Sequence, residues 1–438
     1  MSASNVDGLP VYELAEWTRR EAEGVRLSEA DRRLAGELSA GGTGRLVVEE
    51  LRSGVRVSAT SWVGVVRFER FEVRVVPKLV GGDLGLVEMV EFAMGLDALR
   101  RIPGVRTLSA EGRSLLDLVA LLLAEECERI ARGGLLADYV EAEDELPAVR
   151  GRLLGDRQVL QKFGRVDRVI CRYDELVQDV AENQVLAAAL EKCAKRVTSE
   201  EVRLRAGRMR SLFAEACSPE KLNPEAARRQ MTYNRMNAHY RDAHALSWLI
   251  LDGLRALKDI YTPDRARCFA FMIDMNLLFE MFVRRLLERA LDSPSYAIDY
   301  QRADRSIIWD ADKNRPYSRV IPDLLVRSRR HPSRAVAVDA KYKLYDERKV
   351  SPADLYQSFL YAYAYGAESG GETPSAVIVY PATAGAGRAI NLRVRSAAKM
   401  EGARISAVGI SIPECLAWLA GGKTAPSVDA IKEALRAS

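Results

Sequence analysis

The chain has 438 residues, of which 48% are apolar and 29% are charged, a composition typical of folded domains and not of disordered or fibrous chains. At about 100 to 200 residues per domain, this length accommodates two or three domains. The 65 Lys and Arg nearly balance the 61 Asp and Glu, which excludes a uniformly basic coat but allows a local patch that binds nucleic acid.

Histidine and cysteine usage narrows the possible chemistry. Three scattered histidines disfavour His-based metal hydrolysis and Ser–His–Asp catalysis, so carboxylates are expected to carry any reaction. The six cysteines form no CxxC pair and are expected to be buried thiols in a reducing cytosol. Because the N-terminus lacks signal-peptide features and the most apolar stretch, 115–124, is too short to span a bilayer, we expect a cytoplasmic protein without membrane contact.

Residues 1–100 are expected to form a β-rich N-terminal module. The charged segments 13–20 and 29–37 favour helices. From Arg45, short β-branched runs with tight turns continue to Pro77-Lys78 and predict a small meander or barrel. These runs are Leu46–Val48, Val55–Val57, Val63–Val66 and Phe71–Val76.

Residues 101–262 are expected to form a helical middle region. Apolar residues recur at spacings of three and four in several segments. These segments are Leu115–Ile130, Val177–Arg196, Ala206–Ala216 and Ala243–Leu257. A further segment with the same pattern, Val87–Met94, lies just before the region. One charged stretch, Tyr139–Leu154, breaks the helical pattern and is expected to be extended.

Residues 263–438 favour an α/β sheet domain. Two helices are predicted at Phe271–Leu291 and Ala353–Tyr365, with helical segments after Pro413. Strands are predicted at Ser306–Trp309, Arg319–Val326, Ala335–Tyr342, Ala376–Tyr380, Ala389–Val394 and Ile405–Ile412. The fold class is therefore α+β and multidomain.

The stretch from Ile321 to Tyr345 carries the strongest chemical signal. Two apolar runs flank a polar turn centred on position 331, so they predict an antiparallel hairpin. Asp323 and Asp339 lie at equal distances from that centre, which places them opposite each other with Cβ atoms about 5 Å apart. Lys341, two residues beyond Asp339, projects from the same face.

Two carboxylates and a lysine at one place suit phosphodiester hydrolysis. Asp323 and Asp339 would hold Mg²⁺, with the Ala340 carbonyl as a further ligand, and Lys341 would orient the attacking water or stabilise charge on the phosphate. The competing interpretation is a charged pair that protects an edge strand from aggregation. The apolar run Ala335–Val338 argues against it, because a central strand carries charges only where they are used.

Pro322-Asp323 and Asp339-Ala340-Lys341 resemble the motif of the PD-(D/E)xK nuclease superfamily. The resemblance implies two auxiliary residues: Glu280, a helical glutamate near the metal, and Gln357, in the helix after Lys341. Glu280 shares a face with apolar residues, including Leu277, and has the alternative of pairing with Arg284 four residues on. The alternative for Gln357 is a plain surface residue.

Further stretches resemble the McrC family, the nuclease subunits of McrBC-type modified-cytosine restriction systems. They are Trp62–Leu79, ending in Pro-Lys; Tyr139 with Leu146–Leu153, which contains Arg-Gly-Arg; Glu182-Asn183; and Phe279-Glu280. With the nuclease motif in the same order, the resemblance covers roughly residues 45 to 400.

The resemblance implies a partner of the McrB type, a AAA+ GTPase. The sequence contains no GxxxxGK[ST] phosphate loop, so GTP would be used only through that partner. By analogy the N-terminal module would dock to the GTPase; the alternative is a purely structural barrel. Double-stranded, modified DNA would be the substrate, with Mg²⁺, or Mn²⁺ in its place, as the metal.

Other candidate residues have competing interpretations. Arg327, Arg329, Arg330 and Arg334 lie in or beside the hairpin turn and are predicted to contact the DNA backbone, although such clusters also serve solubility. Asp310 and Asp312 are alternative carboxylates in a polar loop and are expected to be solvated. The helix with Tyr356, Tyr361, Tyr363 and Tyr365 is expected to pack on the sheet and not to stack on bases.

The sequence thus predicts a Mg²⁺-dependent endodeoxyribonuclease subunit of a GTP-dependent, modification-directed restriction system. It comprises an N-terminal module (1–100), a helical middle (101–262) and a PD-(D/E)xK domain with a central mixed sheet (263–438). Two alternatives remain open: a non-cleaving activator of a GTPase ring, and a nuclease of DNA repair or RNA processing that acts without a GTPase.

Overall fold

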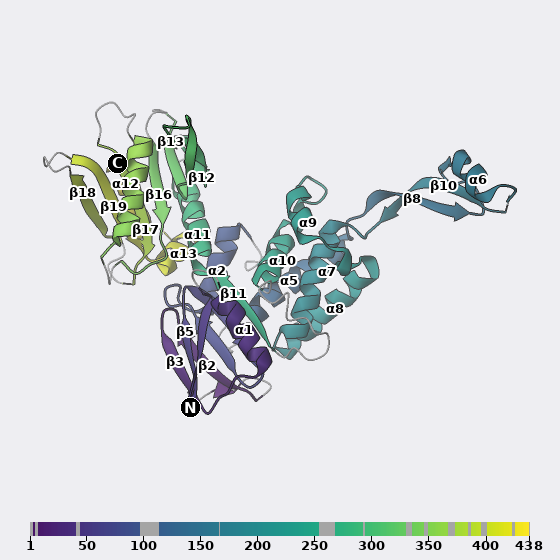
Figure 1. The fold of residues 1–438 in the computed structure, drawn as a ribbon, viewed down its shortest axis with the longest axis horizontal. Coiled ribbons are helices and arrows are strands. Elements are labelled where there is room, and N and C mark those ends of the chain that lie inside the picture. Colours follow the sequence, from purple (N-terminus) through teal and green to yellow (C-terminus); the bar gives the residue numbers. More distant parts are fainter. Residues whose placement is uncertain are drawn as a thin grey trace. The chain divides into compact units, whose positions relative to one another are not determined.

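The computed structural model divides into two compact units, described separately below (Figure 1). One unit combines Met1–Leu115 with Gly253–Ser438, and the other is Leu116–Asp252. The described residues are 3–4, 8–40, 44–96, 114–165, 167–253, 268–291, 294–329, 335–345, 349–366, 373–383, 387–395, 401–422 and 425–437. The division into 1–100, 101–262 and 263–438 remains a prediction from sequence.

The N-terminal part of the first unit contains two sheets. The five-stranded sheet has the order β1 (Ala3–Ser4), β2 (Pro10–Ala15), β7 (Glu72–Val76), β6 (Trp62–Arg67) and β11 (Phe269–Asp274). The three-stranded antiparallel sheet has the order β3 (Arg19–Glu23), β5 (Gly54–Ala59) and β4 (Leu46–Leu51). Helices α1 (Glu29–Ser39) and α2 (Asp83–Met94) belong to the same part, and Ser28 and Asp31 form a capping box at the start of α1.

Strand β11 links segments far apart in the sequence. It pairs antiparallel with β6, and Gly64 lies opposite Met272 with a φ of 140°. A Cβ at Gly64 would lie 2.0 Å from the carbonyl oxygen of Phe271, so only glycine permits this close approach. The first strand after residue 263 therefore completes the N-terminal sheet.

The C-terminal sheet has six strands. Its order is β12 (Tyr296–Tyr300), β15 (Leu324–Ser328), β16 (Ala335–Ala340), β17 (Ser375–Pro381), β19 (Glu401–Ile410) and β18 (Ala389–Arg395). β16, β17 and β19 run parallel, and the outer strands pair antiparallel. All of β17 is buried, as expected for a central strand covered on both faces.

Four helices and a two-stranded sheet accompany this sheet. The helices are α11 (Met275–Ala290), α12 (Pro352–Gly366), α13 (Ile412–Leu419) and α14 (Pro426–Ala437). Helix α12 packs on the face that carries Ala337, because Tyr361 joins Ala337, Val320 and Leu325 in one apolar cluster. β13 (Asp304–Asp310) and β14 (Arg315–Val320) form a separate antiparallel ribbon.

The second unit is a helical body with a projecting arm (Figure 1). The body contains α5 (Leu115–Gly133), α7 (Ala181–Arg196), α8 (Glu200–Ala216), α9 (Pro224–Gln230), α10 (Arg241–Gly253) and two 3₁₀ turns, Pro219–Lys221 and Ala238–Tyr240. The arm contains β8 (Asp138–Leu146), β9 (Arg152–Leu153), α6 (Gly155–Lys162) and β10 (Val169–Val177). The Asn183 amide donates to the carbonyls of Leu136 and Gln178, so one buried side chain fixes both ends of the arm.

Most predicted elements are confirmed, including the extended segment after Tyr139. The predicted helix at 13–20 is wrong: β2 and β3 occupy it, because Leu14 and Ala22 alternate with polar residues and face the core. The helix predicted from Phe271 begins instead at Met275, after β11, with Asp274 as its N-cap. The helix predicted from Val177 begins at Ala181, because Val177 ends β10.

The six cysteines are free and buried, as predicted. Within the described residues, none of the helices is both long and apolar enough to cross a bilayer.

Candidate active site

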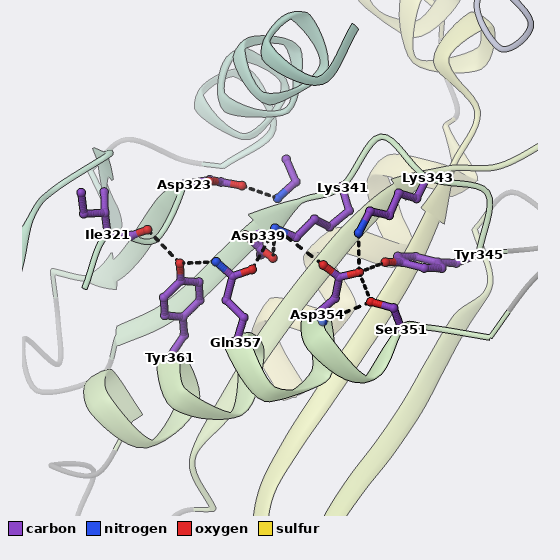
Figure 2. Close-up of polar contacts among 11 residues, drawn as sticks. Ile321, Asp323, Asp339, Lys341, Lys343, Tyr345, Ser351, Asp354, Gln357 and Tyr361 are labelled. Carbon is purple, nitrogen blue, oxygen red and sulfur yellow. Dashed lines mark hydrogen bonds and ion pairs between the residues drawn. The ribbon is translucent and has the colours of Figure 1, made fainter. Parts of the chain in front are cut away.

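The hairpin β15–β16 determines where the two predicted aspartates lie. Its register pairs Leu324 with Val338 and Leu325 with Ala337, which is the alignment predicted from the centre of the turn. Asp323 and Asp339 are each the next residue beyond the Leu324–Val338 pair. The Ala340 amide donates a hydrogen bond of 2.8 Å to Asp323 Oδ2, so this carboxylate lies across the end of β16 (Figure 2).

Asp339 is a buried carboxylate with few partners. Its exposed fraction is 1%, and neither carboxylate oxygen has a hydrogen-bond partner among the described residues. Lys341 Nζ lies 2.9 Å from Asp339 Oδ2 as an ion pair. A buried carboxylate with a single cationic neighbour is costly unless further positive charge reaches it.

Burial and neighbouring charges alter the ionisation of Asp323 and Lys341. Burial raises the pKa of Asp323 well above its usual range, and the nearby charges of Asp339 and Glu280 raise it further, against the lowering effect of the Ala340 hydrogen bond. Burial lowers the pKa of Lys341, but the negative charges of Asp339, Asp323 and Asp354 outweigh this, so its net pKa is raised. Lys341 is therefore a cation held beside two carboxylates that repel each other.

Gln357 of α12 lies at the site and contacts Lys341. Its Oε1 accepts a hydrogen bond of 3.0 Å from Lys341 Nζ, and its Nε2 donates to the Tyr361 hydroxyl at 2.9 Å (Figure 2). The Tyr361 hydroxyl in turn donates to the Ile321 carbonyl at 2.8 Å. Because that hydroxyl uses its proton on Ile321, it accepts from Nε2, which leaves Oε1 directed at Lys341.

A second buried carboxylate, Asp354, lies on the other side of Lys341 (Figure 2). Its Oδ2 accepts from Lys343 Nζ at 2.7 Å and from the hydroxyls of Tyr345 and Ser351. Burial raises the pKa of Asp354, but these hydrogen bonds outweigh burial and the net pKa is below its usual value. Its Oδ1 lies 4.0 Å from Lys341 Nζ.

Glu280 of α11 lies close enough to the aspartates to raise the pKa of Asp323. The alternative pairing of Glu280 with Arg284 is not formed, because Arg284 pairs with Glu288 and lies over the Tyr300 ring. Instead, Glu280 Oε1 accepts a hydrogen bond of 2.7 Å from Gln301 Nε2. Of the apolar residues expected to share its face, Val283 and Leu287 are buried and Leu277 is 51% exposed, so the half-buried Glu280 lies at the rim of the buried surface.

The observed side chains fit a divalent cation at Asp323 and Asp339. Apart from the Lys341 ion pair, the two Asp339 oxygens lack partners among the described residues, and burial together with the Asp339 charge raises the pKa of Asp323, so added positive charge would stabilise both. No group of three or more His, Cys, Asp or Glu side chains in the described part of the chain is arranged to hold a metal. A metal here would rest on the two aspartates, with the Ala340 carbonyl and waters completing an oxygen shell as Mg²⁺ prefers.

Two of the four predicted DNA-contacting arginines can be placed. Arg327 Nη2 lies 2.5 Å from Asp299 Oδ2, and Arg329 Nε donates to the Tyr296 carbonyl at 3.2 Å. Both belong to the end of the hairpin remote from Asp323, and both make contacts within the domain. Arg330 and Arg334 lie outside the described residues.

The remaining candidates do not join the site. Asp310 accepts a hydrogen bond from the Lys313 amide, and Asp312 is exposed. Of the tyrosines in α12, Tyr361 is buried, whereas Tyr356 and Tyr363 are exposed on the outer face.

Sequence reasoning missed the contacts of three residues at the site: Gln301, Asp354 and Tyr361. Gln301 has an unusual φ of 44°, and its amide donates to the Asp323 carbonyl while its side chain holds Glu280. Asp354 lies three residues before Gln357, and Tyr361 lies four after it. These spacings of three and four residues were the only signal in the sequence for Asp354 and Tyr361, since they place both side chains on the same face of α12 as Gln357.

Comparisons with known proteins identify the family of the chain. The family described as McrBC 5-methylcytosine restriction system component matches residues 57–381. The Type IV methyl-directed restriction enzyme EcoKMcrBC of Escherichia coli (strain K12) is 22% identical over 312 residues, which cover 67% of this chain and 84% of that protein.

A solved structure has the same overall fold. A chain of the half-complex from the tetradecameric assembly of Thermococcus gammatolerans McrB AAA+ hexamers with bound McrC superposes with a TM-score of 0.58 at 20% identity. The superposition covers 97% of this chain and 99% of that chain. Since the family match spans well over half of the sequence, the chain belongs to the McrBC 5-methylcytosine restriction system component family.

Proposed function

We propose that this chain is the endodeoxyribonuclease subunit of an McrBC-type, GTP-dependent and modification-directed restriction system. The observation that carries the proposal is the convergence of Asp323, Asp339 and Lys341 at the end of β16, with Gln357 behind the lysine. This arrangement supports the PD-(D/E)xK assignment, because it has two carboxylates for a metal and a cation beside them.

The two aspartates and the Ala340 carbonyl would hold Mg²⁺, or Mn²⁺ in its place, and Glu280 would lie at the edge of this site. The divalent cation supplies positive charge that polarises the scissile phosphate and lowers the pKa of the attacking water. Asp339 is proposed as a ligand of this cation because its oxygens are buried and have no hydrogen-bond partner among the described residues.

Lys341 would stabilise charge that develops on the phosphate and orient the attacking water. Its raised pKa keeps the ammonium charged at neutral pH. Gln357 and Asp354 hold Nζ from two directions, at 3.0 Å and 4.0 Å. A cation fixed in advance stabilises the transition state without a cost for reorganising the site.

The partner in this proposal is a AAA+ GTPase of the McrB type, since the relatives with this fold are described in complexes with McrB AAA+ hexamers. GTP would be hydrolysed by that partner, and the N-terminal module would dock to it. The substrate is double-stranded, modified DNA, and Arg327, Arg329, Arg330 and Arg334 remain predicted backbone contacts. The assembly would act in the cytoplasm.

The test is a cleavage assay with the co-purified GTPase partner on methylated and unmethylated duplex DNA, with GTP and Mg²⁺. Asp339→Ala and Lys341→Ala are expected to lower cleavage by roughly a thousand-fold or more, with folding and partner binding retained. Lys349→Ala is the matched control, because Lys349 is an exposed lysine eight residues after Lys341 and its side chain makes no hydrogen bond or ion pair with the described residues.

Three outcomes would contradict parts of the proposal. Metal-dependent cutting by the Asp339 and Lys341 variants would refute the site assignment. GTPase stimulation without cutting by the wild type would favour the non-cleaving activator. Cutting that needs neither GTP nor the partner would favour a repair or RNA-processing nuclease.

A further inference from the structure

The ribbon formed by residues 304–320, which comprises β13, β14 and their turn, carries exposed aromatic and basic side chains. Trp309 is 49% exposed and Tyr317 is 76% exposed. Every residue of β14 from Arg315 to Arg319 is exposed, and only Val320 at its end is buried. Large aromatic side chains with so much exposed surface on an ordered strand are typical of a surface that binds another molecule.

The cations of this ribbon are available to a ligand. Arg305, Lys313, Arg315 and Arg319 are all exposed, and their side chains have no ion-pair or hydrogen-bond partner within the described residues. Arg327 and Arg302, by contrast, both pair with Asp299. The unpaired positive charge favours a negatively charged ligand.

The ribbon is fixed in position at its base. Val320, Ile307 and Ile308 pack against Ala337 and Tyr361, the residue that orients Gln357. At the tip, Asn314 adopts a φ of 47°, which asparagine tolerates, and accepts a hydrogen bond from the Trp309 indole at 3.2 Å. The outward side chains are therefore displayed on a structured element.

The spacing of the outward residues suits a sugar-phosphate backbone. Arg315, Tyr317 and Arg319 are all exposed on β14, and the register of the ribbon shifts between Ser318 and Pro316, so Tyr317 bulges from the strand between the two arginines. Arg315 and Arg319 are four residues apart, at most about 14 Å along an extended strand, which is long enough to reach more than one phosphate of a single DNA strand. Arg319 is four residues from Asp323, at most about 14 Å along the chain.

We infer that the 304–320 ribbon binds the phosphate backbone of the DNA duplex next to the scissile bond, with Arg315 and Arg319 on phosphates and Tyr317 on the adjacent sugar or base. This inference rests on the proposed nuclease function and adds a second substrate-contacting surface to the arginines of the hairpin turn. The acidic groups nearby are Asp304, which accepts from Ser306, and Asp310 and Asp312 at the tip. In the register of the ribbon Asp310 lies opposite Arg315 and Asp304 lies opposite Val320, so these two acidic groups lie at the two ends of the ribbon.

The test measures binding and cleavage separately. A fluorescent 30-base-pair DNA duplex is titrated with the full-length protein in EDTA, at several salt concentrations, by fluorescence anisotropy. Arg315→Gln with Arg319→Gln is expected to weaken binding and to make the plot of log affinity against log salt shallower by roughly 0.9 per arginine. Tyr317→Ala is expected to weaken binding without changing this slope. Tyr317→Phe keeps the aromatic ring and is expected to bind like wild type.

The matched control is Arg393→Gln with Arg395→Gln. These two arginines have the same i, i+2 spacing and are exposed, but they lie on β18, at the opposite edge of the six-stranded sheet. An equal loss with this control pair would reduce the effect to general charge and overturn the inference. Unchanged DNA binding by the ribbon variants, with loss of binding to RNA or to the GTPase, would also overturn it.

Failure of the ribbon inference can be told apart from failure of the nuclease proposal. If the wild type cleaves DNA and the ribbon variants bind and cleave normally, only the ribbon inference fails. If the wild type binds duplex DNA through the ribbon but never cleaves it, the nuclease proposal fails and the ribbon assignment stands. Thermal unfolding checks that the exposed substitutions leave the fold intact.

Discussion

Asp339 and Asp354 are two buried carboxylates on either side of Lys341, and they differ in how the protein satisfies them. Asp354 receives hydrogen bonds from Lys343, Tyr345 and Ser351, and its pKa falls despite burial. Among the residues that the structure describes, Asp339 receives only the ion pair with Lys341, while its neighbour Asp323 has a raised pKa. A carboxylate that supports structure is neutralised by its own chain, whereas Asp339 is left able to bind positive charge from outside.

The strongest test of this comparison replaces each aspartate by asparagine. Asp354→Asn is expected to lower the free energy of unfolding by about 3 to 4 kcal/mol, because buried donors of Tyr345 and Ser351 lose an anionic acceptor. Asp339→Asn is expected to leave stability unchanged or raised, because it removes repulsion with Asp323. Chemical denaturation in EDTA measures both.

Equal destabilisation by the two substitutions would contradict the distinction between a structural and a functional carboxylate. Lys349→Ala, on an exposed side chain, sets the baseline for a neutral change.

A third buried carboxylate, Glu16, extends the comparison to the pH dependence of stability. Burial raises the pKa of Glu16 to about 7, against the lowering effect of hydrogen bonds from the Lys78 amide and the Tyr342 hydroxyl. An acid whose folded pKa lies above its unfolded value stabilises the fold at low pH and loses this contribution as pH rises through about 7. The loss amounts to about 3 kcal/mol at most.

Glu16→Gln is expected to remove this dependence, so that the variant gains stability relative to wild type between pH 5 and pH 8. Denaturation curves at each pH give the difference, in which all other titrating groups cancel. A difference that stays constant over this range would show that Glu16 titrates near its usual value.

Metal addition should separate Asp339 from Asp354 directly. A divalent cation that binds only the folded protein raises its stability, by about 2.7 kcal/mol at 100 times the dissociation constant. Mg²⁺ is therefore expected to raise the melting temperature of wild type and of Asp354→Asn, but not of Asp339→Asn. Glu280→Gln should show a reduced shift if this glutamate reaches the metal.

This measurement is independent of cleavage, since scanning fluorimetry follows unfolding alone. An undiminished shift in Asp339→Asn would remove Asp339 from the metal site even if that variant were inactive.

The sequence predicted the parts of the site that depend on local geometry. The register of the hairpin follows from the turn between two apolar runs, so the relation of Asp323 to Asp339 could be inferred from counting residues. Lys341 followed from the period of two in a strand. Gln357 required the resemblance to a nuclease motif, because its contact with Lys341 joins α12 to the residue that follows β16, 16 positions earlier in the chain.

Contacts between distant segments could not be predicted in this way. Glu280 and Gln301 meet because α11 packs on β16 and the Gln301 amide is hydrogen-bonded to Asp323, and Glu16 meets Tyr342 across 326 residues of chain. No local spacing encodes either contact. The helix predicted at 13–20 was wrong for a related reason. The charges of this segment suggested a helix, but the pairing of β2 with β7 and of β3 with β5 outweighed that local preference.

The smallest expected effect concerns Tyr361, which connects the packed face of α12 to the site. Tyr361→Phe keeps the buried ring but removes the hydroxyl between Gln357 and Ile321, at a stability cost of about 1 kcal/mol. The Gln357 amide can then rotate and turn Nε2 toward Lys341, which would displace the ammonium. Cleavage is expected to fall roughly ten-fold, whereas Tyr363→Phe, on the exposed face, should cleave like wild type. If Gln357→Ala lowers cleavage but Tyr361→Phe does not, Lys341 alone orients the amide, and the packed tyrosine supports only the fold.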